Sequence, residues 1–101
     1  MASEISEISV LHDRDRHRWE ARIGEELAGF ATYRPSEGVI DVQHTEVHPA
    51  FEGRGVGGVL VRAALDEVAA GADRVVPSCP FVAAWLERHP DYQHLTTRER
   101  D

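Results

Sequence analysis

Apolar and polar residues alternate along the first half of the chain, which is the spacing of strands with one buried face. Residues 16–23 show this most regularly, with Trp19, Ala21 and Ile23 on one face and charged side chains on the other. Three further segments follow the pattern more loosely and are predicted as strands: residues 5–11, 27–33 and 39–47. Polar or glycine-containing segments predict the turns between them: residues 12–15, 24–26 and 34–38. The first half should therefore form an antiparallel meander, in which Gly29 marks a bulge or a close backbone approach.

The spacing of apolar residues changes to a helical period after the fourth strand. A helix is predicted to begin at Val56 and end at Gly71 as its C′ residue. Its apolar face consists of Val56, Val59, Leu60, Ala63 and Ala64 and is widened by Val61, Leu65 and Val68. A short strand at residues 73–77 follows, then a second helix that begins at Pro80 and is stopped by His89-Pro90. One more turn at residues 91–95 is expected to pack through Tyr92 and Leu95, ahead of a frayed tail at residues 96–101.

These elements give the order ββββαβα in one domain of residues 1–101, which is an α+β fold class. Most of the sheet is expected to be antiparallel, because its first four strands follow one another through turns. The last strand follows a helical crossover, so it can pair in parallel with its neighbour.

Composition narrows the possible partners. The chain has a net charge of −7 and no lysine, and its 11 basic residues are arginines spread along the sequence. An acidic domain without a basic run argues against nucleic acid and anionic membranes as partners. No apolar run approaches the ~20 residues of a membrane helix. The single cysteine, Cys79, cannot form an internal disulfide, so we expect a reducing, cytoplasmic location, with the oligomeric state open.

Residues 48–58 are the part of the sequence that indicates a ligand-binding function. Four glycines in six positions fit a turn where the backbone comes close to another group, and the turn lies between a strand and a helix. The first N–H groups of a helix have no intrahelical partners, and the helix dipole places partial positive charge there. We therefore interpret this stretch as a cradle for a phosphorylated ligand.

Two nucleotide motifs fit this stretch less well. Gly53-x-Gly55-x-x-Gly58 matches the letters of the dinucleotide fingerprint, but five residues separate Val47 from Gly53, and the next strand ends without an acidic residue. A nucleotide P-loop requires a lysine, and the sequence has none. A nucleotide-binding domain is therefore kept only as a weaker alternative for the function of this chain.

Residues 46–58 closely resemble the acetyl-CoA motif of the GNAT superfamily of N-acetyltransferases. The shared features are a strand ending in Val-x-Pro, a short loop with an aromatic residue, and a glycine-rich segment that opens a helix. Glu52 departs from the motif, because the superfamily usually has arginine or glutamine at this place. An acid beside a pyrophosphate weakens binding unless Arg54 and the backbone amides compensate.

The resemblance covers about residues 18–95 and implies a GNAT-like sheet with a splayed parallel strand pair. It implies that acetyl-CoA is the co-substrate, with no metal. The Val47 backbone would then pair with the pantetheine arm, and the amides of residues 54–58 would hold the pyrophosphate. The cofactor-binding residues implied in this way are Val47, His48, Glu52, Gly53, Arg54, Gly55, Val56, Gly57 and Gly58.

The chain resembles a small subfamily of minimal GNAT-like proteins, because only the polar turn at residues 12–15 stands where the superfamily usually has one or two helices. Those helices help to shape the acceptor site. Two functions therefore stay open. The first is transfer of acetyl from acetyl-CoA to an unidentified amine, and the second is a non-catalytic module that binds or senses acyl-CoA.

Amine acetylation requires a base, and three residues are candidates for the chemistry. His44 and Glu46 are expected on one face of the strand that leads to the glycine loop, together with Val42. The superfamily commonly uses a strand-borne glutamate near this place, which favours Glu46 as the base. Cys79 is expected at a helix N-terminus, where a thiol pKa falls, so it could accept the acetyl group or simply be a buried residue.

The remaining side chains that could take part in catalysis or bind a metal are interpreted as structural or solvated residues. Tyr92 lies near the position of a tyrosine acid in the superfamily, but we interpret it as a core or surface residue. Four histidines show no metal-ligand spacing and are expected to be solvated: His12, His17, His89 and His94.

Overall fold

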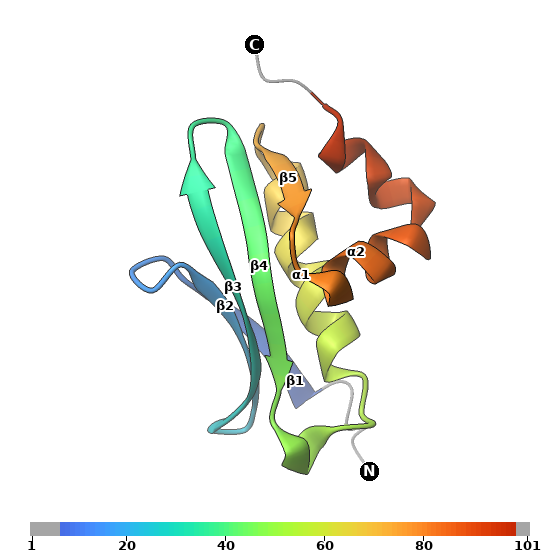
Figure 1. Ribbon diagram of the computed structural model, residues 1–101. Helices are drawn as coiled ribbons and strands as arrows, with labels where there is room; N and C mark the ends of the chain where they lie inside the picture. Colours follow the sequence, from blue (N-terminus) through green and yellow to red (C-terminus); the bar gives the residue numbers. More distant parts are fainter. Residues whose placement is uncertain (1–6, 99–101) are drawn as a thin grey trace.

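The computed structural model describes residues 7–98 as one five-stranded sheet with helices on one of its faces (Figure 1). The strands lie in their sequence order, β1-β2-β3-β4-β5. Their bounds are β1 Ile8–Asp13, β2 Arg18–Ile23, β3 Glu26–Ser36, β4 Val39–Val47 and β5 Arg74–Pro77. The first three pairings are antiparallel and the pairing of β4 with β5 is parallel, which confirms the predicted α+β class. The predicted strand starting at residue 5 begins outside the described residues.

Within the described part of the chain, two α-helices and the 3₁₀ segments η2 and η3 accompany the sheet. They are α1 Val56–Ala70, α2 Pro80–Glu87, η2 Pro49–Phe51 and η3 Pro90–Thr96. Helix α1 packs across β1 to β4, and α2 packs beside it on β4 and β5, so the molecule has one helical layer and one sheet layer (Figure 1). Within residues 7–98, no helix is long and apolar enough to cross a membrane.

The parallel pair separates after four residues, as the resemblance implied. Pairing runs from Val39 opposite Arg74 to Val42 opposite Pro77, and the Cys79 N–H then donates to the Val42 carbonyl at 2.9 Å. Beyond that point the chain after β5 turns into α2 while β4 continues to Val47. The last five residues of β4 therefore have no β-strand partner on this edge among the described residues.

A bulge in β4 corrects the predicted face of one residue. Thr32 pairs with His44 and Tyr33 pairs with Val42, so Gln43 is an extra residue in β4. The bulge puts Val42 in the core, where it is 2% exposed, whereas His44 and Glu46 lie on the opposite, uncovered face. The prediction that all three share one face is wrong, because simple alternation cannot represent one inserted residue.

Gly29 confirms the prediction of a bulge or a close backbone approach. The register of β2 against β3 shifts between Ala21 and Arg22, which leaves Ala28 as the extra residue next to Gly29. A Cβ atom on Gly29 would lie 2.7 Å from the carbonyl oxygen of Glu46. Glycine is therefore required for β3 to lie this close to β4.

Helix α1 buries most of the predicted apolar face, including the residues that widen it. The buried residues are Val56, Gly57, Leu60, Val61, Ala64, Leu65 and Val68. Val59 and Ala63 are only partly buried, because they lie at the edge of the face and border a surface groove. Gly71 does follow the helix, but with φ −101° it is extended and not left-handed, and its N–H donates to the Val68 carbonyl.

His12 corrects the expectation that the four histidines are solvated. Its ring stacks on Trp19 at 4.7 Å, and its two nitrogens contact Glu67 of α1 and, at 2.6 Å, the Tyr33 hydroxyl. The Trp19 indole N–H also donates to Glu67 at 3.1 Å. This polar cluster ties the edge strand β1 to the C-terminal half of α1.

The end of the described chain is anchored, contrary to the expected frayed tail. Thr96 closes η3, and the Arg98 guanidinium donates to the carbonyls of Val68 and Asp73. The expectation is therefore wrong up to Arg98, and residues 99–101 lie outside the described part. The predicted inward packing of Leu95 is confirmed, since this side chain is fully buried.

Candidate cofactor and catalytic site

The loop between β4 and α1 turns through two glycines in the left-handed region. Gly53 has φ 84° and Gly55 has φ 80°, and a Cβ at either position would meet no atom within 4 Å. Glycine is therefore needed there for its backbone conformation and not for space. Gly55 is the N-cap of α1 and supplies no side-chain hydrogen bond, so the N–H groups of the first helical turn have no side-chain cap. This is the local geometry of an anion site.

Of the next two glycines, Gly57 lets α2 pack closely against α1. A Cβ on Gly57 would lie 2.7 Å from the ring of Phe81, which covers this position. A Cβ on Gly58 would be in ordinary contact with the Trp85 indole nitrogen at 4.0 Å. The glycine run thus has two physical roles, since Gly53 and Gly55 shape the loop while Gly57 makes room for an aromatic ring.

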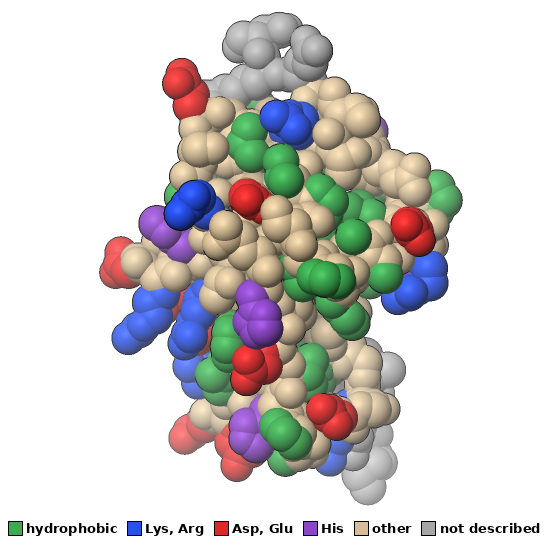
Figure 2. Space-filling view, viewed as in Figure 1, with side chains coloured by type: hydrophobic (Ala, Val, Ile, Leu, Met, Phe, Trp, Pro, Cys, Tyr) green, Lys and Arg blue, Asp and Glu red, His purple; other side chains and the backbone are tan. Residues whose placement is uncertain are grey.

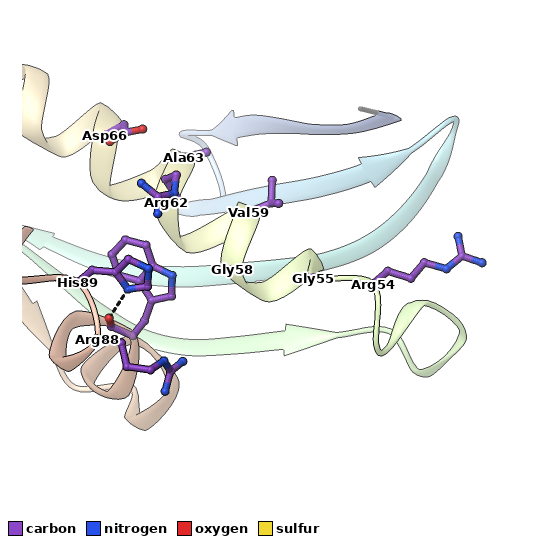
Figure 3. A pocket seen from close by; sticks show the side chains of 10 residues that line it. Arg54, Gly55, Gly58, Val59, Arg62, Ala63, Asp66, Arg88 and His89 are labelled. Atoms are coloured by element: carbon purple, nitrogen blue, oxygen red, sulfur yellow. Dashed lines mark hydrogen bonds between the residues drawn. The ribbon is translucent and has the colours of Figure 1, made fainter. Parts of the chain in front are cut away.

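A groove of about 580 Å³ lies between the two helices and reaches the start of α1. Its lining includes Gly55, Gly58 and three arginines, Arg54, Arg62 and Arg88. In Figure 3, Arg62 and Arg88 come from the two helices, and Arg54 extends outward from the loop ahead of α1. The lining holds three guanidinium groups against one carboxylate, that of Asp66, and the positive end of a helix dipole, so this groove is suitable for anionic ligands.

Glu52 and His48 belong to the loop but do not line the groove. Glu52 is exposed and is not among the residues that line the groove. The His48 ring accepts a hydrogen bond from the Ala50 N–H at 3.2 Å, which fixes the start of η2. The acid that departs from the superfamily motif is thus exposed to solvent and lies outside the groove lining.

Cys79 lies beside the open edge of β4. It is the N-cap of α2, is 3% exposed, and its Sγ lies 3.5 Å from the Thr45 hydroxyl. Burial raises the pKa of this thiol, but hydrogen bonds with Thr45 and with the backbone of Val82 and Phe81 outweigh it and lower the pKa. The thiol therefore combines a lowered pKa with poor accessibility.

His44 and Glu46 form a pair on the uncovered face of the sheet. Their side chains are 59% and 58% exposed, and the His44 Nε2 lies 3.1 Å from a Glu46 carboxylate oxygen. Because Thr45 and Cys79 face the helices, the structure brings His44 and Glu46 together but places Cys79 on the other side of β4. The three catalytic candidates therefore do not form one cluster.

Tyr92 is held away from these candidates by residues of α1. Its hydroxyl donates to Asp66 at 2.5 Å and accepts from Arg62 at 3.1 Å. The hydrogen bond to Asp66 raises the pKa of Tyr92. These contacts give Tyr92 a structural role in joining η3 to α1.

Sequence reasoning missed the α2 side of the groove. Trp85, Arg88 and His89 line it, and the rings of Trp85 and His89 stack at 3.7 Å. Their spacing of three and four residues places them on one helical face, which was the available signal. The sequence analysis expected His89 to be solvated, whereas its ring is stacked and partly buried. The Trp85 side chain is buried, and it forms the wall of the groove.

Comparisons with known proteins agree with this architecture. A family model described as GCN5-related N-acetyl-transferase matches residues 18–95. Protein NATD1 from Xenopus tropicalis is 32% identical over 92 residues, which are 89% of this chain and 84% of that protein.

Solved structures show the same fold at lower sequence identity. A GCN5-like protein from Staphylococcus aureus is similar with a TM-score of 0.68 and 23% identity, covering 89% of this chain and 88% of that one. The ribosomal-protein-alanine N-acetyltransferase from Brucella melitensis biovar Abortus 2308 has a TM-score of 0.55 and 19% identity, covering 93% and 89%. Because the family model spans β2 to β4, the glycine loop and both helices, this chain belongs to the GCN5-related N-acetyltransferase family.

Proposed function

We propose that this chain binds acetyl-CoA at the N-terminus of α1 and transfers the acetyl group to an amine. The observation that carries the proposal is a juxtaposition of two features. Gly53 and Gly55 turn the chain so that the uncapped first turn of α1 follows directly, and the unpaired edge of β4 ends at the same loop. An anion site beside an open strand edge suits a ligand with a pyrophosphate and an amide-containing arm.

The donor is proposed to occupy both features at once. The pyrophosphate would accept hydrogen bonds from the backbone amides of residues 54–58, with Arg54 as an adjacent cation. The nucleotide end would extend into the groove between α1 and α2, where Arg88 supplies positive charge and the Trp85–His89 stack supplies an aromatic surface. The pantetheine arm would then pair with the backbone at Val47 and bring the thioester toward the gap between β4 and β5.

The chemical step uses the pair on the uncovered face. Glu46 would take the proton from the incoming amine, directly or through water, and His44 at 3.1 Å would hold its carboxylate in place. The amine nitrogen then forms a C–N bond with the acetyl carbonyl carbon as the C–S bond breaks. The CoA thiolate leaves with the bonding electrons and takes up a proton.

Covalent transfer through Cys79 is the second candidate for this step, favoured by its lowered thiol pKa. In that reaction the Cys79 thiolate would take the acetyl group from CoA and pass it to the amine. We expect direct transfer instead, because Cys79 is 3% exposed and faces away from Glu46. Cys79→Ala should keep turnover within a fewfold of wild type, and mass spectrometry after mixing with acetyl-CoA alone should find no acetyl on the Cys79 peptide. An acetylated Cys79 that is consumed when an amine is added would establish the covalent route.

The binding of acetyl-CoA is tested by thermal stability. A ligand at about 100 times its Kd adds about 2.7 kcal/mol of stability, which shifts the Tm of a domain of this size by roughly 11–22 °C. We expect this shift with acetyl-CoA and not with NADH or ATP. Arg88→Gln should reduce it, while Arg34→Gln, a matched change of an exposed arginine outside the groove, should not.

The outcomes separate the two functions that remain. No shift with acetyl-CoA at millimolar concentration would contradict the proposal as a whole. A shift without thiol release above background, across a panel of amines, would leave the alternative of a non-catalytic acyl-CoA-binding module.

A further inference from the structure

We propose that the amine acceptor also carries a carboxylate, and that the uncovered face of the sheet binds this carboxylate through Arg18 and Arg22. The inference rests on the proposed function, because it assigns the amine end of the same acceptor to Glu46. Its support is independent of the donor site and comes from strands β2, β3 and β4.

The uncovered face is the side from which an acceptor can reach Glu46. Both helices pack on the other face, so the side chains of Glu46 and His44 project away from the helical layer. Figure 2 shows basic side chains gathered on this view of the molecule over the β2–β3 side, next to a histidine and an acidic side chain near its middle. A small cavity of about 50 Å³ adjoins Glu46 and is lined also by Leu27, Phe30 and His48.

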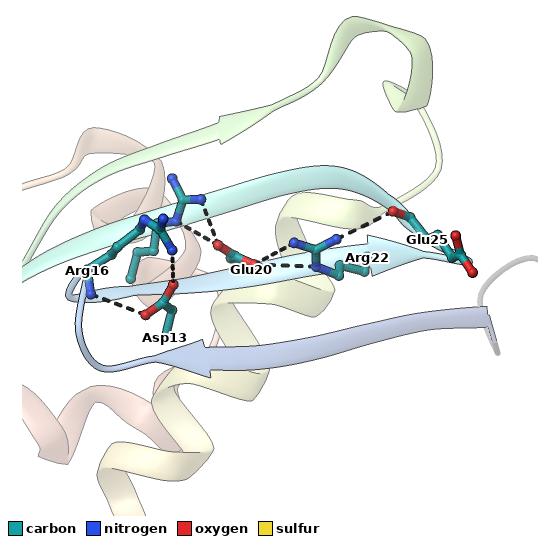
Figure 4. A network of polar contacts seen from close by, with 6 residues as sticks. Asp13, Arg16, Glu20, Arg22 and Glu25 are labelled. Carbon is teal, nitrogen blue, oxygen red and sulfur yellow. Dashed lines mark hydrogen bonds and ion pairs between the residues drawn. The ribbon is translucent and has the colours of Figure 1, made fainter.

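A preorganised arginine pair lies on the same face. Arg18 and Arg22 flank Glu20 along β2 and bind its two carboxylate oxygens at 2.6 Å and 3.0 Å (Figure 4). Glu20 is only 5% exposed, and burial raises its pKa, but the hydrogen bonds and charges of the two arginines outweigh this and lower it. Two cations share one anion, so this trio has a net positive charge in a chain whose net charge is −7.

The guanidinium groups keep donors available on the surface. The Arg18 and Arg22 side chains are 25% and 34% exposed, whereas that of Glu20 is 7% exposed. Arg18 also lies over the Phe30 ring, with its guanidinium carbon 5.1 Å from the ring centre. The Glu20 carboxylate and the Phe30 ring restrict the rotamers of the arginine side chains. Little conformational entropy is therefore lost when a ligand binds the remaining N–H groups.

The strand register aligns the arginine pair of β2 with the His44–Glu46 pair of β4, on either side of β3. Phe30 of β3 pairs with both Glu20 of β2 and Glu46 of β4, and Thr32 pairs with both Arg18 and His44. The arginine pair is therefore two strands away from the His44–Glu46 pair, a backbone distance of about 10 Å. The Phe30 ring lies between them, 6.2 Å from the His44 ring.

This arrangement selects a ligand by charge and length. A cationic or neutral amine fits beside Glu46, an apolar segment fits over Phe30, and a planar carboxylate matches the fork of a guanidinium group. A molecule of about dipeptide size spans the two ends. A simple alkylamine would leave the arginine end without a partner, and a long polycation would be repelled there.

The first test measures binding without requiring turnover. Backbone amide signals of the full chain, saturated with CoA, are followed by NMR during titration with alanyl-alanine or with its C-terminal amide. We expect the free dipeptide to bind at least about tenfold more tightly than the amide, because a charge-assisted hydrogen bond is lost. Signals of Arg18, Glu20 and Phe30 should move. Equal binding of the two peptides, or no binding of either at tens of millimolar, would overturn the proposal.

Matched variants assign the preference to the arginine pair. Arg18→Gln should abolish the tenfold preference, and Arg18→Lys, which keeps the charge but not the fork, should retain part of it. Arg34→Gln removes an exposed arginine further along β3 and should change nothing. A preference that survives in Arg18→Gln would contradict the assignment.

The proposed function fails separately from this inference. Loss of the response of residues 53–58 to CoA would refute the donor site even if the dipeptide still bound. A normal CoA response with no discrimination between the two peptides would refute only the acceptor class.

Discussion

Replacing Glu46 with glutamine should lower kcat for acetyl transfer by about 10²–10⁴-fold, the usual contribution of a positioned general base. Glutamine keeps the size of the side chain but cannot accept the amine proton. The Kd of acetyl-CoA should stay within a fewfold of wild type, since the Glu46 side chain lies on the sheet face opposite the helices. Stopped-flow or steady-state thiol release gives kcat, and the thermal shift gives donor affinity.

The control for this prediction is Glu37→Gln, which neutralises an exposed acid in the turn at the other end of β4. That variant should retain full activity. His44→Gln should fall between the two, because it removes the partner that positions Glu46 at 3.1 Å but leaves the base itself. An unchanged kcat in Glu46→Gln would show that another group, or solvent, takes the proton.

Gly29→Ala should destabilise the fold by about 1–3 kcal/mol, toward the upper end of that range for overpacking. The added methyl group would lie 2.7 Å from the Glu46 carbonyl oxygen and 3.3 Å from the Val47 Cα. Both are backbone atoms of β4, so the two strands would have to separate. Since about 4–8 °C of Tm corresponds to 1 kcal/mol in a domain this small, thermal or urea denaturation would show the loss clearly.

The same substitution at Gly58 is the matched control. Gly58 lies inside α1, and its Cβ would be in ordinary contact with the Trp85 indole at 4.0 Å. Alanine is favoured over glycine in helices by up to about 1 kcal/mol, so Gly58→Ala should leave stability unchanged or raise it. If Gly29→Ala were as stable as Gly58→Ala, the close approach of β3 to β4 would not be a constraint on the sequence.

The strand and helix segments were predictable because their signals are local. Alternation defined β4 as Val39–Val47 with both ends correct, and Pro80 marked the start of α2. The glycine loop was equally accessible, since its spacing relative to the preceding strand is a property of neighbouring residues. The family model supports the resemblance drawn from that spacing.

The faces of the strands were less predictable, because a single bulge reverses them. Nothing in the residues around Gln43 distinguishes a bulge from a regular strand, and so Val42 was placed with His44 and Glu46. Glu20 shows a related limit. Alternation put it correctly on the face away from the core, but its burial depends on the arginines two residues away on each side.

Contacts between distant segments could not be read from the sequence at all. His12 meets Glu67 across 55 positions, and the groove needs Arg62 and Arg88 from two different helices. Periodicity indicates which residues share a face of one element but not which face of another element they meet. The parts of the candidate site formed by tertiary packing were therefore the parts that were missed.

Strand β4 is paired with β3 on one edge and is free of β5 beyond Val42 on the other, so it stands between two stretches of contiguous sequence. The proposed donor site is built from the second stretch, residues 39–89. Most of the proposed acceptor face is built from the first stretch, residues 8–36. The two meet at one strand, β4, which contributes to both. Donor and acceptor specificity can therefore evolve separately, and a chimera that exchanges only the N-terminal meander between relatives should inherit a new acceptor together with the old donor.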